Sequence, residues 1–260
     1  MKKFVLRSML AAIIVVVAFA VFYAWRSFPI ISGFGAKDLC SCVFVAGRSE
    51  DDVKKQELGG FPFTLGSYKI NSKDSSVTGS VLGLARRKAI YREGLGCTIV
   101  NDLSEEEIRR QQFRVRGPDK ASNLAELPWP VGDKLSDTFP SQIDKAKLDS
   151  AVAAAFTEPD STKKRRTRAV VVLYDGQLVA EQYADGFDRN SRMHGWSIAK
   201  SITAAMIGVL VKQGKINVDD KAPIESWKGT PKEAITVRHL LQQTSGLAFR
   251  EDYSGYSEVT

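Results

Sequence analysis

A serine and a lysine three residues apart, Ser197 and Lys200, are the best candidates for covalent chemistry in this chain. On a helix this spacing puts both side chains on one face, one turn apart, so that a hydroxyl and an amine can share a proton. Serine is a good nucleophile only when a base takes its proton, and lysine serves as that base only where burial or neighbouring cations lower its pKa. The apolar residues Trp196, Ile198 and Ile202 predict such surroundings.

The same spacing occurs again at Ser161 and Lys164, in a polar, basic stretch with no apolar helix behind it. Nothing there would desolvate the lysine, so the pattern favours Ser197. The competing interpretation of Ser197 is structural, as a helix-capping serine followed by a lysine whose stem lies on apolar surface. As a nucleophile at a helix N-terminus, Ser197 could also supply its backbone N–H to an oxyanion hole.

Other catalytic patterns are absent from the sequence. Residues 195–199 read GWSIA rather than the Gly-x-Ser-x-Gly elbow of many hydrolases. His194 and His239 could each pair with a serine, but His239 lies within a predicted helix, where a structural hydrogen bond is expected. There is no Gly-rich phosphate loop, dinucleotide fingerprint or paired-histidine metal motif. We therefore expect neither a metal nor an organic cofactor.

Two helices are predicted around these residues. Helical spacing and a following Gly214 predict a largely buried helix over residues 197–213, with its apolar positions at Ile198, Ile202, Ala205, Met206, Val209 and Leu210. A second helix is predicted from Thr236, as its N-cap, to about Thr244, closed by Gly246.

Upstream patterns supply a third helix and a hairpin. Residues 144–156 have helical spacing behind Asp144. Residues 169–174 and 177–183 flank Asp175-Gly176, which tolerates the positive φ angles of a type I′ turn. The order helix, hairpin, helix, helix predicts an α+β fold.

The N-terminus carries a membrane-directed segment. Residues 9–25 are apolar and uncharged, follow three basic residues and precede Arg26. Residues 18–20 (AFA) fit a signal-peptide cleavage site, whereas the apolar continuation to residue 25 fits an uncleaved anchor. Residues 1–26 are therefore a signal peptide or a membrane anchor. Because basic residues stay inside, the rest is expected on the periplasmic or extracellular side, anchored or secreted.

The three cysteines are Cys40, Cys42 and Cys97. In an oxidising compartment a disulfide from Cys40 or Cys42 to Cys97 is expected, with the third thiol left over. Three buried free cysteines are the alternative. The spacing is a poor match to a zinc site, whose ligands usually come in closer pairs.

Residues 27–139 are predicted to be an N-terminal extension and linker. Four β-like runs at 43–45, 61–65, 76–85 and 97–100 predict a small strand-containing module. Residues 116–143 contain four prolines and two glycines and predict an extended connector.

Composition excludes several classes of protein. With 43% hydrophobic and 26% charged residues, the 260-residue chain is not collagen-like, disulfide-scaffolded or wholly disordered. The net charge of +7 includes three basic residues of the leader, and no basic stripe with interleaved aromatics predicts a nucleic-acid partner. The basic run 163–168 (KKRRTR) is expected to be a solvated loop.

Three ordered segments resemble the serine β-lactamase-related hydrolases: MHGWSIAKSIT at 193–203, GKINVDDKAP at 214–223, and ITVRHLL followed by TSGL within 235–247. Within that superfamily the chain most resembles the 6-aminohexanoate-dimer hydrolase and esterase branch, which has the class C β-lactamase and DD-peptidase fold. Segments 36–45 and 91–98 resemble the N-terminal extension of exported proteins in that branch.

This resemblance implies a β-lactamase/transpeptidase-like domain, which is an antiparallel sheet flanked by helices. Residues 140–260 would be the N-terminal part of that domain. The resemblance implies Ser197 as the acylated nucleophile and Lys200 as its proton partner, acting on a small-molecule amide or ester. A tyrosine near Tyr253 touches substrate in the amide-hydrolase branch, so Tyr253 is a substrate-binding candidate; the alternative is a surface-loop tyrosine.

The family's catalytic tyrosine and its Lys/His-x-Gly strand are expected beyond Thr260, so we expect this chain to be the truncated N-terminal part of a longer enzyme and inactive when taken alone. In that part, the only strands of the hydrolase sheet would be those of the hairpin. Two alternatives to an amide or ester hydrolase stay open: a β-lactamase or DD-peptidase, and a non-catalytic penicillin-binding-like sensor.

Overall fold

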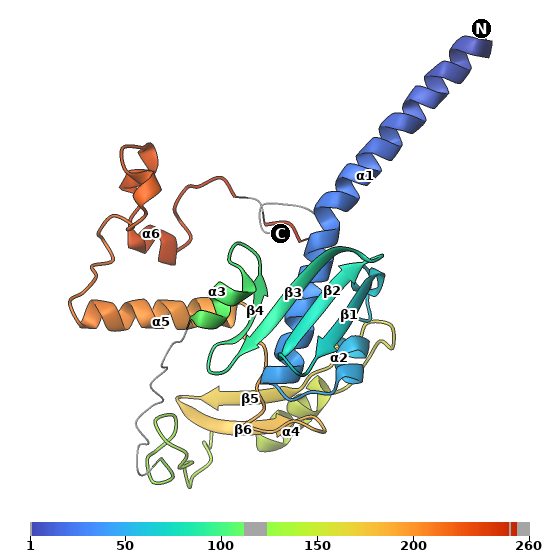
Figure 1. Cartoon of the computed structure of the whole chain (residues 1–260). Coiled ribbons are helices and arrows are strands. Elements are labelled where there is room, and N and C mark those ends of the chain that lie inside the picture. Colours follow the sequence, from blue (N-terminus) through green and yellow to red (C-terminus); the bar gives the residue numbers. More distant parts are fainter. Residues whose placement is uncertain (1, 112–123, 250, 254–260) are drawn as a thin grey trace. The chain divides into compact units, whose positions relative to one another are not determined.

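The computed structural model describes residues 2–111, 124–249 and 251–253. The chain forms two compact units, one of Met1–Tyr91, Cys97–Asp102 and Met193–Thr260, the other of Arg92–Gly96 and Leu103–Arg192. Both helices and antiparallel strands are present, as Figure 1 shows, which confirms the α+β class.

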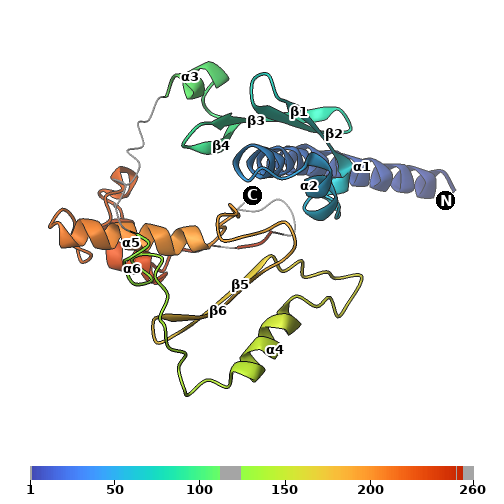
Figure 2. The same cartoon turned by 90° about the horizontal axis from the view of Figure 1, so that it is seen from below.

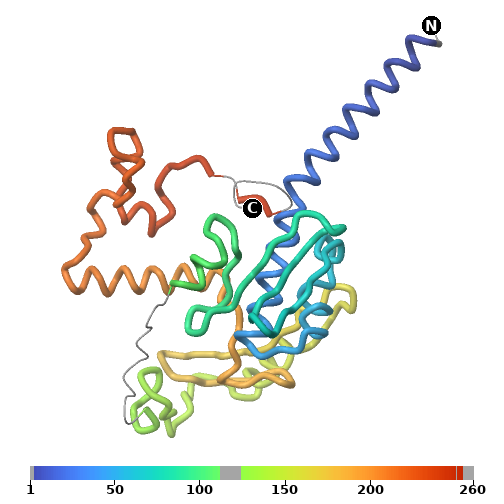
Figure 3. Tube along the Cα trace, viewed as in Figure 1, coloured from blue at the N-terminus to red at the C-terminus, as the bar shows by residue number. Residues whose placement is uncertain are grey.

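The first unit begins with one long helix, α1 (Lys2–Cys40). Helix α1 is long and apolar enough to cross a membrane, a property that signal sequences share. The helix does not stop at Arg26, where the leader was expected to end, but continues without a break to Cys40 (Figure 3). Residues 3–23 are exposed, whereas most of residues 31–40 are buried. The two parts of α1 therefore have different surroundings.

The second half of α1 packs against a four-stranded sheet in the order β1-β2-β3-β4 (Figures 1 and 2). The strands are β1 (Gly66–Asn71), β2 (Ser76–Val81), β3 (Leu84–Arg92) and β4 (Gly96–Val100). β2 pairs antiparallel with both β1 and β3. We call residues 27–102, which hold this sheet and its helix, the N-terminal module.

Two close approaches fix α1 on the sheet. A Cβ at Gly79 of β2 would lie 2.2 Å from the Ser32 carbonyl oxygen of α1, so only glycine lets the two backbones meet there. The Tyr68 ring occupies the space that a Cβ on Gly35 or Gly66 would need. The core around these contacts includes Ala36, Leu39, Val53, Val77 and Ala89, all fully buried.

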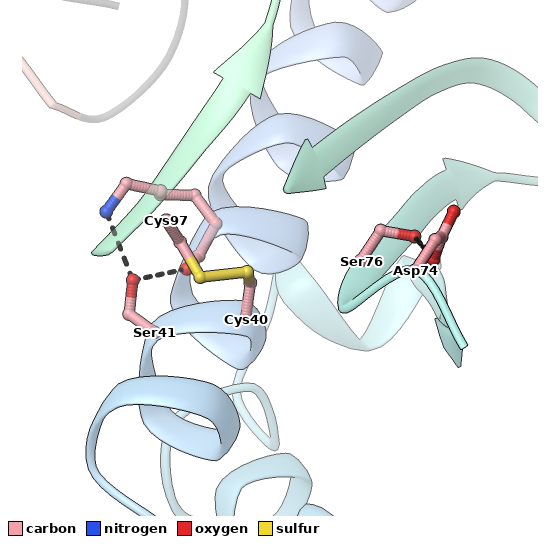
Figure 4. Close-up of a disulfide and its surroundings, with 6 residues drawn as sticks. Cys40, Ser41, Asp74, Ser76 and Cys97 are labelled. Carbon is pink, nitrogen blue, oxygen red and sulfur yellow. Dashed lines mark hydrogen bonds between the residues drawn. A yellow bond between two sulfur atoms is a disulfide. The ribbon is translucent and has the colours of Figure 1, made fainter. Parts of the chain in front are cut away.

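A disulfide joins Cys40, at the end of α1, to Cys97 of β4 (Figure 4). It confirms one of the two expected pairings and leaves Cys42 as a buried free thiol. Beside it, the Ser41 hydroxyl donates to the Lys37 carbonyl at 2.9 Å and accepts from the Lys37 ammonium at 3.1 Å. The end of α1 is therefore held both covalently and by hydrogen bonds.

Only one of the four predicted β-like runs is a strand as expected, since residues 97–100 lie in β4. Val43–Val45 was wrongly predicted, because it belongs to a π-helical segment, Ser41–Val45, that prolongs α1. Val43–Val45 directly follows the end of α1, which the Cys40 disulfide fixes in place. This position decides its conformation, because the strand preference of two valines is weak. Phe61–Leu65 was also wrong: it ends in a 3₁₀ turn, Phe63–Leu65, and the strand begins at Gly66.

The run 76–85 is two strands rather than one. Leu82 and Gly83 both have positive φ, 50° and 75°, and reverse the chain between β2 and β3. Two short helices were not predicted, α2 (Glu50–Gln56) and α3 (Glu105–Arg110). Their N-cap serines, Ser49 and Ser104, were the available signals.

In the second unit, α4 (Lys145–Ala155) and the hairpin of β5 (Ala169–Tyr174) and β6 (Gln177–Tyr183) confirm the predicted elements (Figure 2). Asp175 and Gly176 have φ of 46° and 75°, as a type I′ turn requires. β5 and β6 form a sheet by themselves.

Two further segments of this unit, 124–143 and 157–168, form no helix or strand. Residues 163–166 are exposed, as expected for the solvated part of the basic run. Of the predicted connector, 124–143 holds turns and an isolated bridge from Pro128 to Lys134, and its first part, 116–123, lies outside the described residues.

Two helices follow in the first unit. α5 (Ile198–Lys212) is followed by Gly214 at φ 66°, as predicted. α6 (Val237–Leu241) ends earlier than the predicted Thr244, because Gln243 takes a φ of 57° that no helix continues through.

Candidate active site

The turn before α5 positions Ser197 at the helix start. Trp196 has a φ of 41°, a left-handed conformation uncommon for a bulky residue. The first helical bonds form at once, from the Ile198 N–H to the Gly195 carbonyl at 2.8 Å and from the Lys200 N–H to the Ser197 carbonyl at 3.0 Å. A constrained turn therefore leads directly into a regular helix.

Ser197 and Lys200 meet as their spacing predicts. The Lys200 Nζ and the Ser197 Oγ are 3.1 Å apart, within hydrogen-bond distance. Both residues are exposed. The geometry needed for proton exchange between the two side chains is present.

Ser197 does not act as a capping serine. Its side chain makes no capping hydrogen bond, and its backbone is helical, at φ −67° and ψ −11°, rather than extended as at most N-caps. Other helix starts behave differently: the side chains of Ser49, Ser104, Asp144 and Thr236 each accept a hydrogen bond from a backbone N–H of the first turn. The Ser197 hydroxyl is instead directed to Lys200.

The predicted apolar surroundings are not found among the described residues. Trp196 and Ile198 are each 66% exposed and Ile202 is 58% exposed, and no residue of α5 is buried. The prediction of a largely buried helix was wrong, because the described part of the chain places no apolar layer over this face.

The turn before Ser197 is in contact with the N-terminal module, within the same compact unit. The Trp196 ring stacks on Phe34 of α1, with ring centres 5.9 Å apart, and Phe34 stacks in turn on Phe63. The Nδ1 of His194 lies 3.2 Å from Oδ1 of Asp38. Phe34, Asp38, His194 and Trp196 line an open pocket of about 290 Å³.

Tyr253 and His239 have local partners. The Tyr253 hydroxyl donates to the Glu251 carboxylate at 2.7 Å, and the described contacts do not bring it together with Ser197 or Lys200. The His239 Nδ1 accepts from the Thr236 N–H at 3.2 Å and completes a capping box, as the expected structural role requires.

Phe34 and Asp38 were not predicted as site residues from the sequence. Each lies in the half of α1 that was assigned to an extension, far along the chain from Ser197. One signal was available: Asp38 is a carboxylate in a stretch otherwise rich in small and apolar residues, ISGFGAKDLC. A carboxylate buried in such a stretch needs a partner, so its position indicates a polar contact with another part of the chain.

Residues 152–258 match the family model described as Beta-lactamase. The match supports placing this part of the chain with the serine β-lactamase-related proteins, and with hydrolase chemistry at the level of the family. It includes the turn before α5, the helix itself and the segments after it. No solved structure matches the chain.

Proposed function

We propose that the chain carries the nucleophile of a serine hydrolase that cleaves amide or ester bonds through an acyl-enzyme, with Ser197 as nucleophile and Lys200 as its proton partner. One observation carries the proposal: the Ser197 hydroxyl caps no helix and instead lies 3.1 Å from the Lys200 amine. The family match over residues 152–258 supports the same chemistry.

In the proposed reaction the Ser197 Oγ attacks the carbonyl carbon of the substrate while its proton passes to the neutral Lys200 amine. The oxyanion that forms accepts a hydrogen bond from the Ser197 backbone N–H, at the positive end of the α5 dipole. Lys200 then protonates the leaving amine or alcohol as its bond to carbon breaks. Water hydrolyses the acyl-enzyme and restores the serine.

A neutral lysine requires a site shielded from water. The exposed side chains Ile198, Ile202 and Met206 form an apolar stripe along α5, on a different face from Lys200, of the kind that working proteins cover. We propose that this surface is covered in the active enzyme. A cover that also extends around the helix to Lys200 and Trp196 would desolvate the lysine and complete the site.

The nucleophile can be tested with a fluorophosphonate probe on the full-length gene product. We expect one label per chain, lost in Ser197→Ala. The matched control is Ser161→Ala, because Ser161 and Lys164 repeat the spacing in an exposed loop, and this variant should label normally. Label retained in Ser197→Ala would reject the nucleophile.

A substrate panel separates the classes of activity. Turnover of the 6-aminohexanoate dimer or a p-nitrophenyl ester, without penicillin hydrolysis, would support the 6-aminohexanoate-dimer hydrolase-like assignment. Rapid penicillin hydrolysis would support a β-lactamase. Slow acylation by penicillin that leaves a trapped acyl-enzyme would support a DD-peptidase or a sensor. Tyr253→Phe tests its proposed substrate contact: an unchanged KM across the panel would remove it.

We also propose that α1 anchors the protein in a membrane, with the N-terminal module on the periplasmic or extracellular side. Its exposed apolar half supports this placement. Carbonate extraction of membranes tests the anchor, and protease protection of intact cells tests the side.

A further inference from the structure

A second cluster of reactive groups lies beside the Ser197 turn. It joins Asp38 and Cys42 of the N-terminal module to His194, and the ligand atoms of the three side chains all lie within 4.8 Å of one another. Asp38 lies near the end of α1 and Cys42 in the π-helical segment Ser41–Val45 that prolongs it, and the two side chains come together there. His194 comes from the turn that precedes the nucleophile.

One oxygen of the buried Asp38 carboxylate lacks a hydrogen-bond partner among the described residues. The residue is only 6% exposed, and its Oδ2 has no hydrogen-bond partner among the described residues, while Oδ1 lies 3.2 Å from His194. A buried carboxylate oxygen without a partner is costly. A bound cation would satisfy it.

The nearby cationic side chains are engaged elsewhere. Lys37 lines the same cavity, but its ammonium donates to the Ser41 hydroxyl at 3.1 Å. Arg48 donates to the Glu57 carboxylate at 2.7 Å and to the Cys42 Sγ at 3.6 Å. The second of these contacts places a cation beside the sulfur, but burial, with the charge of Asp38 second, raises the pKa of the Cys42 thiol, so a thiolate would form there only on metal binding.

We propose that Asp38, Cys42 and His194 bind one divalent transition-metal ion of the zinc class, with a fourth position open to water. Thiolate, imidazole and carboxylate are the donors that zinc accepts in tetrahedral sites. Donors around such an ion lie about 3.3–3.8 Å apart. The three side chains therefore need to close by about 1 Å, which side-chain rotation can supply, and Cys42 releases its thiol proton to water.

The ion would link two parts of the first unit. Two ligands belong to the module whose fold a disulfide holds, and the third is three residues before Ser197. Metal binding would thus fix the turn that presents Ser197, in addition to the stacking of Trp196 on Phe34. This site does not depend on Ser197 being a nucleophile.

The test titrates the full-length protein in detergent with Co²⁺, under nitrogen and without thiol reductant so that the disulfide persists. We expect one equivalent to bind with a thiolate-to-cobalt charge-transfer band, and Zn²⁺ to abolish the band by displacement. Cys42→Ala should lose the band. Asp38→Asn and His194→Gln should weaken binding by more than the roughly 10- to 100-fold typical of removing a second-shell partner.

The chain offers two controls. His239→Gln removes the other histidine, which caps α6, and should bind Co²⁺ as the unchanged protein does. Ser197→Ala should also bind, which separates this proposal from the proposed nucleophile. A band that survives in Cys42→Ala, or no band at one equivalent, would overturn the site.

A measurement on the unaltered protein covers the case in which the Asp38, Cys42 or His194 variants fail to fold. In the unaltered protein, stoichiometric Zn²⁺ should slow alkylation of Cys42 by iodoacetamide at least about 10-fold, because the bound thiolate is withheld. Equal alkylation rates with and without Zn²⁺ would overturn the proposal.

Discussion

The N-terminal module and α5 use similar apolar residues in opposite ways. In the module, side chains such as Leu39, Val77 and Ala89 are fully buried in the core between α1 and the sheet. On α5, Ile202 and Met206 are 58% and 63% exposed. The difference places the stabilising burial of apolar area in the module and leaves the apolar residues of α5 in contact with water.

The largest expected effect is loss of the Cys40–Cys97 disulfide, which closes a separation of 57 residues. Replacing both cysteines by alanine should destabilise the module by roughly 4 kcal/mol, because the unfolded chain regains loop entropy. Hydrogen exchange of the β2 and β4 amides would report the change. Unchanged protection would show that the module does not depend on its crosslink, and the comparison with α5 would lose its basis.

The same substitution placed in each region tests the comparison directly. Ile90→Ala, at a fully buried position of β3, should cost about 2–5 kcal/mol by leaving a cavity. Ile202→Ala on α5 should stay within about 0.5 kcal/mol, since the side chain is mostly exposed and alanine favours helix. Hydrogen exchange in β3 and α5 measures the pair. A large cost at Ile202 in the full-length protein would instead reveal the cover over α5.

Gly79→Ala tests the close approach of α1 to the sheet. The added Cβ would lie 2.2 Å from the Ser32 carbonyl oxygen, a backbone atom that cannot rotate away, so a cost of about 1–3 kcal/mol is expected. Gly60→Ala is the matched control, because no atom lies within 4 Å of its Cβ position. Equal exchange protection in the two variants would contradict the packing.

The smallest effect concerns alkaline pH. Burial, with the negative charge of Asp38 second, raises the pKa of Tyr68 to about 12. The unfolded tyrosine loses its proton near its ordinary pKa of 10, so this contribution to stability is full below pH 10 and lost as pH rises toward 12. Absorbance titration of phenolate, with Tyr68→Phe for assignment, checks the window. A Tyr68 pKa near 10 would show that the ring is not shielded.

The sequence predicted elements whose signals are local. The Asp175-Gly176 turn, the Asp144 cap and the Gly214 stop depend on residues adjacent to the elements they bound, and the structure has all three. The contact between Ser197 and Lys200 was predictable for the same reason, because helical geometry alone brings them together. Their catalytic roles stay predictions.

Non-local contacts were not predictable. Val43 and Val45 have strand-forming side chains, yet a helix end and its disulfide decide their conformation. The burial of α5 was inferred from its own periodicity, but burial requires a partner surface that periodicity does not identify. The approach of His194 to Asp38 joins residues 156 positions apart, and nothing in either local sequence indicates the other.

One half of α1 is the proposed membrane anchor, and the other half belongs to the core of the N-terminal module. The residues that cover the sheet begin near Ile31, whereas the apolar residues suited to lipid end near Trp25. A protease that cut after Ala20 would release a module with its glycine contacts and crosslink intact. The membrane-attached and the released forms would then have the same fold in this module and differ only in their location.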